Sequence, residues 1–234
     1  MKDVIYVEHK NFISVKDHSL SFKNLINKTI KYIPIDDISM VIFDNIDSYF
    51  SNQVVNVCVN NDIGMIFCGI NHSPIADISS TYCHRKKLER IKSQLSVSYK
   101  TKQRLWKKII SAKIINQSEC LIAQTNDKIK FNELVITSKE VKEGDIDNRE
   151  AYAALIYFDC LFGKDFKRGR YQDKINAALN YGYALIRAVI RKELAIAGFE
   201  MSIGIFHRSS ENPFNLSDDL IEPFRPFIDS IVYE

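Results

Sequence analysis

The hydrophobic pattern of this chain changes near residue 75, and that change limits the available folds more than any other feature. Up to that point the apolar residues form short, partly alternating runs of Val, Ile, Tyr and Phe, which is typical of β-strands. The predicted strands lie in DVIYVEH, FISVKDHSLSF, TIKYIPI, ISMVIFD and GMIFCG. SNQVVNVCVNN fits a strand or a helix, because Val54, Val57 and Cys58 share one helical face, and we favour the helix.

From about Asp77 the apolar residues recur every three to four positions, as in amphipathic helices. The longest such stretches are TKQRLWKKIISAKIINQSECLIA, NREAYAALIYFDCLFG and DKINAALNYGYALIRAVIRKELAIAGF. Gly163 and Gly198 are predicted to end the last two helices. The chain is therefore predicted to be an α+β protein, with a small β-rich N-terminal domain at residues 1–75 and a larger all-α C-terminal domain at residues 76–234.

Composition excludes several classes of protein. Hydrophobic residues make up 46% of the chain and charged residues 26%, as in ordinary globular domains. No run approaches the roughly 18 to 20 apolar residues that span a bilayer, and the N-terminal MKDVIYVEHK is charged where a signal peptide is apolar. The five cysteines form no CxxC motif, so we expect free thiols in a cytoplasmic protein without a membrane partner.

A block of positive charge occupies residues 80–108, where ten basic residues face the single acid Glu89. The basic residues are Arg85, Lys86, Lys87, Arg90, Lys92, Lys100, Lys102, Arg104, Lys107 and Lys108. A solvated helix face is the usual explanation of such a run. Here all the charges but one are positive, so i,i+4 salt bridges cannot run along the helix, and aromatic residues are interleaved. The block therefore favours contact with the phosphates of a nucleic acid.

Three acidic or imidazole-bearing positions are candidates for chemistry. Glu150 stands at the start of a predicted helix, where its spacing from Asp147 also fits a capping box. His207 follows the apolar run MSIGIF, so it is either a buried core histidine or a ligand. Asp219 and Glu222 are three residues apart and would share a helical face. Carboxylates with an imidazole suit Mg²⁺ or Mn²⁺, although no short-range motif links the three segments.

The ordered set of motifs resembles one known family. NREAYAALIYFDCLFG, FKRGRYQDKINAALNYGYALIRAVIRKELAIAGF, SIGIFHR and NPFNLSDDLIEPFRPFID together resemble the CRISPR adaptation integrases, the universal Cas-one family. YIPIDDISMVIFDN, IGMIFCG and LWKKIISAKIINQ extend the resemblance over essentially the whole chain. The wording of the last motif is most similar to the type II branch.

The resemblance implies a β-rich N-terminal domain that dimerises and a helical catalytic domain. By motif it assigns Glu150 in NRE, His207 in FHR and Glu222 in LIEPFRP as catalytic ligands of Mg²⁺ or Mn²⁺, with Asp219 as a candidate assisting acid. The implied activity is CRISPR spacer acquisition, in which the 3′-hydroxyl ends of a prespacer are joined to the leader–repeat junction by transesterification. Family members continue beyond EPFRP, so a C-terminal truncation is predicted at Glu234.

The same resemblance implies partners. It predicts a homodimer that binds double-stranded DNA, as prespacer and as leader–repeat, and a dimer of the small Cas-two protein. In the type II branch an accessory ring protein that binds DNA ends and the effector nuclease join them. The residues predicted to contact DNA are Arg85, Lys86, Lys87, Arg90, Lys107, Arg168, Arg170, Arg187 and Arg208.

Two other functions compatible with these residues are kept as alternatives. A metal-dependent nuclease acting on branched or single-stranded DNA would use the same ligands, with water as the nucleophile. A non-catalytic DNA-binding scaffold would need only the basic residues.

Overall fold

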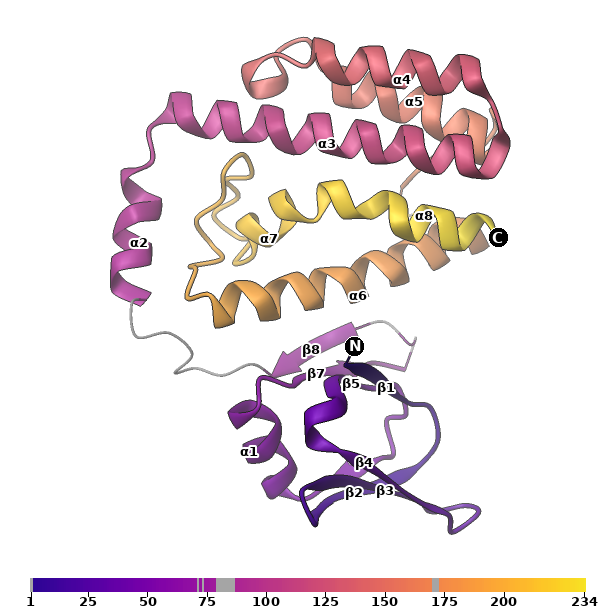
Figure 1. The fold of residues 1–234 in the computed structure, drawn as a ribbon, viewed down its shortest axis with the longest axis vertical. Coiled ribbons are helices and arrows are strands. Elements are labelled where there is room, and N and C mark those ends of the chain that lie inside the picture. The colour runs from indigo at the N-terminus through magenta and orange to yellow at the C-terminus, as the bar shows by residue number, and fades with distance from the viewer. Residues whose placement is uncertain (1, 71, 73, 79–86, 170–172) are drawn as a thin grey trace. The chain divides into compact units, whose positions relative to one another are not determined.

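The computed structural model describes residues 2–70, 72, 74–78, 87–169 and 173–234 (Figure 1). The chain forms two compact units, one of residues 1–85 with 195–198 and the other of residues 86–194 with 199–234. The first is rich in strands and the second is helical, which confirms the predicted α+β class.

The N-terminal unit contains two four-stranded sheets. One has the order β1-β5-β7-β8, with β1, β5 and β7 parallel and β8 antiparallel. The other has the order β4-β3-β2-β6. The bounds are β1 Asp3–Val7, β2 Asn11–Lys16, β3 Ser19–Asn24, β4 Ile30–Pro34, η1 Ile35–Asp37, β5 Ile38–Phe43, β6 Tyr49–Phe50, α1 Asn52–Asn60, β7 Gly64–Cys68 and β8 Pro74–Ile78.

Local sequence explains how these elements form. The predicted strand FISVKDHSLSF is a hairpin, because Asp17 and His18 adopt positive φ angles of 45° and 55° and turn β2 into β3. The helix favoured for SNQVVNVCVNN is confirmed as α1, which buries Val54 and Cys58. The boundary predicted at residue 75 falls inside β8, which pairs with β7 through Ile78, so the strand region extends beyond it.

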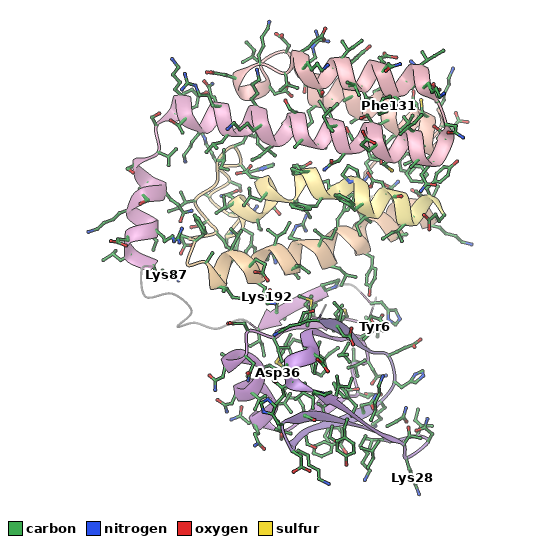
Figure 2. All side chains as sticks on the ribbon, viewed as in Figure 1. Tyr6, Lys28, Asp36, Lys87, Phe131 and Lys192 are labelled. Atoms are coloured by element: carbon green, nitrogen blue, oxygen red, sulfur yellow. The ribbon has the colours of Figure 1, made fainter. Side chains whose placement is uncertain are left out.

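The helical unit begins at α2, where the first residue, Lys87, is exposed to solvent (Figure 2). The bounds are α2 Lys87–Ser96, α3 Tyr99–Thr125, α4 Lys128–Glu140, η2 Glu143–Asp145, α5 Arg149–Phe162, α6 Lys174–Ile196, α7 Asn215–Leu220, η3 Glu222–Phe224 and α8 Arg225–Tyr233. Gly163 and Gly198 follow α5 and α6 with φ angles of 91° and 77°, as predicted for helix stops. Among the described residues, no helix is long and apolar enough to cross a membrane.

The long helix α3 organises this unit. Ser98 caps its first turn by accepting from the Thr101 N–H, and Asn126 ends it in the left-handed conformation. The helix packs against α4 and α5 on one side and against η3 and α8 on another (Figure 1). Residues in the middle of α3 are consequently surrounded by other elements, and a charged side chain there needs a partner.

A second core joins α6 to the C-terminal segment. Leu179, Tyr183 and Ile221 are buried together, and a Cβ built at Gly182 would collide with Ile228 of α8. The absence of a side chain at Gly182 therefore lets α6 and α8 approach closely. This packing fixes η3, which carries Glu222, between α3 and α6.

The described cysteines carry free thiols, as expected. Cys58, Cys68 and Cys120 are buried and Cys160 is partly buried, whereas Cys83 lies outside the described residues. Burial raises the pKa of the Cys58 thiol to about 11, so this side chain behaves as a small apolar residue rather than a nucleophile.

Candidate active site in the helical unit

Lys113 draws two glutamates from distant segments onto one point. Its Nζ lies 2.5 Å from Oε1 of Glu150, in the first turn of α5, and 2.5 Å from Oε2 of Glu222, in η3. The side chains of Lys113 and Glu222 are 11% and 8% exposed and that of Glu150 is 29% exposed. Three segments that are far apart in the sequence therefore converge on one buried positive charge.

The charges of this group stabilise one another. Burial by itself disfavours the charged forms of Lys113 and Glu222, but their mutual attraction outweighs it. The pKa of Lys113 is consequently raised, and Lys113 and Arg225 together lower the pKa of Glu222. Arg225 reaches Oε1 of Glu222 through its Nε at 2.9 Å. Two carboxylates and two cations thus form a group without net charge.

His207 belongs to a second group, organised by Asp219. The Asp219 carboxylate is fully buried and accepts the backbone N–H groups of Ile205, Phe206 and His207 at 2.5, 3.0 and 3.0 Å. It also lies 2.7 Å from Nδ1 of the His207 ring. Because a carboxylate only accepts, Nδ1 carries the proton and the neutral ring keeps the lone pair of Nε2. The Asp219 hydrogen bond also raises the pKa of His207 against the opposing effect of burial.

A cavity of about 980 Å³ opens beside the glutamates. Glu150, Glu222 and Lys113 line it on one side, and Leu155 and Phe158 contribute an apolar wall. Its remaining charged lining consists of the cations Lys167, Arg168, Arg187 and Arg225 and the acids Asp159 and Asp229. The site can therefore accommodate a large anionic group next to the two carboxylates.

The structure thus arranges the predicted ligands in two groups. Glu150 and Glu222 meet at Lys113, whereas His207 pairs with Asp219 and does not line the described cavity. In the part of the chain that the structure describes, no three His, Cys, Asp or Glu side chains are gathered so that they could hold a metal ion. A metal at these residues stays a prediction.

The chemistry of the donors nevertheless fits a divalent cation. Two carboxylate oxygens already face a single cationic position at hydrogen-bond distance. Oxygen donors of this kind suit Mg²⁺ and Mn²⁺, and the free Nε2 of His207 is a further donor of the correct type. Ligating histidines commonly bond a carboxylate through the other ring nitrogen, as His207 does with Asp219.

The capping box considered for Glu150 is wrong. The first turn of α5 is capped by Asp145, whose two carboxylate oxygens accept the backbone N–H groups of Arg149 and Glu150 at 2.9 and 3.0 Å. Asp147 instead pairs with Lys142 at 2.7 Å. Because Asp145 satisfies the helix terminus, the Glu150 side chain is available for Lys113.

The residues predicted to contact DNA lie in several places. Arg168 and Arg187 line the cavity, where Arg168 donates to Asn176 and Asn180 and Arg187 pairs with Asp218. The remaining described positions are exposed Lys87, Arg90 over the ring of Phe199, partly buried Lys107, and Arg208 over the ring of Tyr99. Arg85, Lys86 and Arg170 lie outside the described residues. DNA contact by any of them stays a prediction.

Sequence reasoning missed Lys113, although the sequence carried a signal. Lys113 comes four residues after Ile109 and three after Ile110, so it occupies the apolar stripe of its helix. A lysine in such a stripe is buried only with partners, which indicates an ionic group in the interior.

Sequence reasoning also missed the buried acid Asp229. It is 1% exposed and accepts a hydrogen bond from the Tyr183 hydroxyl. Burial raises its pKa to about 6.

Comparisons with known proteins agree with this fold. The sequence profile of the family described as CRISPR associated protein Cas1 matches residues 4–234. The chain is 35% identical over 200 residues to the CRISPR-associated endonuclease Cas1 of Neisseria meningitidis serogroup C, a match that covers 86% of this chain and 65% of that protein. It is 24% identical to the CRISPR-associated endonuclease Cas1 2 of Saccharolobus solfataricus, over 99% of this chain and 74% of the relative.

Solved structures show the same fold. A Cas1 protein from Thermotoga maritima superposes with a TM-score of 0.74 at 15% identity, covering 99% of this chain and 77% of its own. A casposase bound to integration product superposes with a TM-score of 0.77 at 20% identity, covering 100% and 72%. Because the family profile matches nearly the whole chain, this protein belongs to the Cas1 family of CRISPR-associated proteins.

Proposed function

We propose that this chain is a metal-dependent DNA integrase of CRISPR spacer acquisition, which joins prespacer 3′-hydroxyl ends to the leader–repeat junction. The observation that carries the proposal is the convergence of Glu150 and Glu222 on one cationic position at the edge of a cavity lined by arginines. Membership of the Cas1 family supports it, as does the likeness in fold to a casposase solved with an integration product.

The reaction is a transesterification at phosphorus. The 3′-oxygen of the prespacer forms a bond to the target phosphorus, and the bond from that phosphorus to the neighbouring 3′-oxygen breaks. The proton of the attacking hydroxyl ends on the departing oxygen, so the number of phosphodiester bonds is unchanged. Mg²⁺ or Mn²⁺, when bound, supplies positive charge to the crowded phosphate and the departing oxygen.

The residues of the chain prepare this step. Glu150 and Glu222 supply carboxylate donors, and Arg225 fixes the orientation of Glu222 through its second oxygen. Asp219 holds the His207 ring so that Nε2 is the available donor atom. Arg168 and Arg187 place positive charge on the cavity wall, where phosphates of the DNA would bind.

We further propose that the chain works in the cytoplasm as a homodimer with double-stranded DNA and a dimer of the small Cas2 protein. Solved relatives with the same fold include a Cas6-RT-Cas1–Cas2 complex and a Cas1–DNA complex, which supports these two partners. The similarity to the Neisseria protein supports the type II branch, and with it the accessory DNA-end ring protein and the effector nuclease.

A metal-dependent nuclease is the second candidate, because the curated relatives carry the name endonuclease. It would use the same residues, with water in place of the prespacer hydroxyl. A scaffold that only binds DNA would need none of Glu150, His207 and Glu222.

One experiment separates these functions. A 5′-labelled prespacer is incubated with supercoiled leader–repeat plasmid, the Cas2 partner and Mn²⁺, either with 3′-hydroxyl or with 3′-deoxy ends. We expect labelled plasmid only with the 3′-hydroxyl ends, and none with Glu150→Ala or His207→Ala. Glu8→Ala, an exposed glutamate of the N-terminal unit, is the matched control and should join normally.

The other outcomes oppose the proposal in distinct ways. Nicking that ignores the prespacer indicates the nuclease. Unchanged DNA binding and assembly in the Glu150 and His207 variants, with no joining by any protein, indicate the scaffold.

A further inference from the structure

We propose that the ammonium group of Lys113 occupies the position of the divalent cation, so that Lys113 and the metal compete for Glu150 and Glu222. Lys113 then sets how tightly the site binds metal and couples metal binding to the arrival of DNA. This inference rests on the metal site of the proposed function.

Geometry makes the two cations mutually exclusive. Nζ of Lys113 lies 2.5 Å from Glu150 Oε1 and 2.5 Å from Glu222 Oε2. A Mg²⁺ ion bound to the same two oxygens would lie about 2.1 Å from each. An ion at that distance from both oxygens sits close to the point that Nζ occupies, where two like charges repel strongly. Metal binding between these glutamates therefore requires the ammonium group to leave.

The balance of charge shows why this competition matters. Glu150 and Glu222 are already neutralised by Lys113 and Arg225. A divalent cation added to such a group gains little net attraction, whereas two glutamates without Lys113 would attract it strongly. Lys113 consequently weakens metal binding, while its charge offsets the repulsion between the two carboxylates.

The cavity gives the displaced ammonium group a place to go. Lys113 itself lines the cavity of about 980 Å³, which Gln117 and Arg168 also line. Its flexible four-carbon side chain can turn its charge toward a phosphate bound there. DNA then stabilises the displaced position of Lys113, and the vacated glutamates accept the metal. By thermodynamic linkage, metal strengthens DNA binding to the same extent as DNA strengthens metal binding.

Mn²⁺ affinity tests the inference without any measurement of joining. Free Mn²⁺ is titrated by its electron paramagnetic resonance signal against the whole chain, first without DNA. We expect Lys113→Met to bind Mn²⁺ about 10-fold more tightly than the unsubstituted chain. Lys113→Gln, which keeps a hydrogen-bond donor but removes the charge, should also bind Mn²⁺ more tightly. Lys142→Met, which removes an exposed lysine paired with Asp147, should leave the affinity unchanged.

A second pair of measurements tests where the metal binds and what DNA does. Glu150→Gln in the Lys113→Met background should abolish the gain in Mn²⁺ affinity. Duplex DNA with 3′-hydroxyl ends should tighten Mn²⁺ binding to the unsubstituted chain severalfold and have a smaller effect on Lys113→Met. In thermal unfolding without metal, Lys113→Met should melt at a lower temperature and gain more from Mn²⁺ than the unsubstituted chain does.

The outcomes separate this inference from the proposed function. Equal or weaker Mn²⁺ affinity in both Lys113 variants overturns the inference, because a lysine with a structural role alone cannot compete with metal. Absence of Mn²⁺ binding in every protein overturns it as well. If the Lys113 variants bind Mn²⁺ more tightly but no form of the protein joins DNA, the inference is supported and only the integrase function is contradicted.

Discussion

The two units of this protein differ in what they bury. Among the described residues, the N-terminal unit buries only two polar side chains, Ser21 and Asp44, around a core of aliphatic and aromatic residues. The helical unit buries eleven, including Lys113, Asp219 and Glu222. Buried charges contribute little net stability and are costly when a partner is lost. The difference indicates that apolar packing stabilises the first unit. The second unit gives up part of its apolar core to hold a charged site.

Among the substitutions considered, Asp219→Ala in the helical unit should lower the stability of the protein the most. It removes the acceptor of three backbone N–H groups and the partner of His207 from a fully buried position. We expect a loss of more than about 3 kcal/mol in the free energy of unfolding, measured in urea, together with loss of joining. Asp218→Ala removes the partly exposed neighbour that pairs with Arg187 and should cost less than about 1 kcal/mol. Equal costs would show that burial of Asp219 is not the cause.

Leu20→Ala tests the other side of the comparison. Leu20 is fully buried in the N-terminal core, so its truncation leaves a cavity and should cost about 3 kcal/mol in urea unfolding. Mn²⁺ affinity should not change, because the charged site lies in the other unit. Ile26→Ala, at a side chain that is 76% exposed, should leave stability nearly unaltered. A weaker Mn²⁺ affinity in Leu20→Ala would contradict the view that the core of the N-terminal unit does not affect the charged site of the helical unit.

Asp229→Asn should reveal a buried charge that opposes stability. Burial raises the pKa of Asp229 to about 6, above its unfolded value, although the hydroxyls of Tyr183 and Tyr157 favour the charged form. The native state therefore binds more protons than the unfolded state between about pH 4 and 6, and stability falls as the pH rises through that window. The nearby cations Arg168 and Arg225 also favour the charged form of Asp229, but burial outweighs them.

The raised pKa of Asp229 also sets the size of the expected change in stability. Replacement by Asn should flatten this part of the pH dependence and stabilise the chain at pH 7 by about 3 kcal/mol at most. Urea unfolding from pH 4 to pH 7 measures it. An Asn variant whose stability still falls between pH 4 and 6 as in the parent would assign the dependence to another group.

Much of the fold was readable from the sequence because it follows from local periodicity. The strands, α1 and the glycine stops of α5 and α6 depend on hydrophobic spacing and on turn residues, which act over a few positions. The end of the strand region was placed too early, because β8 is a strand only through its pairing with β7. Such pairing is tertiary and leaves little trace in five residues.

The site was readable only in part. The motifs gave Glu150, His207, Asp219 and Glu222, but the spacing between distant segments does not say which side chains meet. The pairing of Glu150 with Glu222 through Lys113 depends on how α3 packs between α5 and η3. Lys113 lies in a helix with several other lysines, and only its place in the apolar stripe distinguishes it from them.

The smallest expected effect concerns DNA binding by two lysines of the helical unit. Lys167 is exposed and lines the cavity, whereas Lys164, three residues earlier, is exposed and does not line it. If phosphates bind in the cavity, Lys167→Ala should weaken DNA binding about threefold and lower the slope of log affinity against log salt by about 1. Lys164→Ala, and Lys31→Ala in the N-terminal unit, should change neither. Fluorescence anisotropy with a labelled duplex at several salt concentrations measures both quantities. An equal loss of DNA affinity in all three variants would mean that binding depends only on the overall charge of the protein. It would contradict the cavity as the site where the phosphates bind.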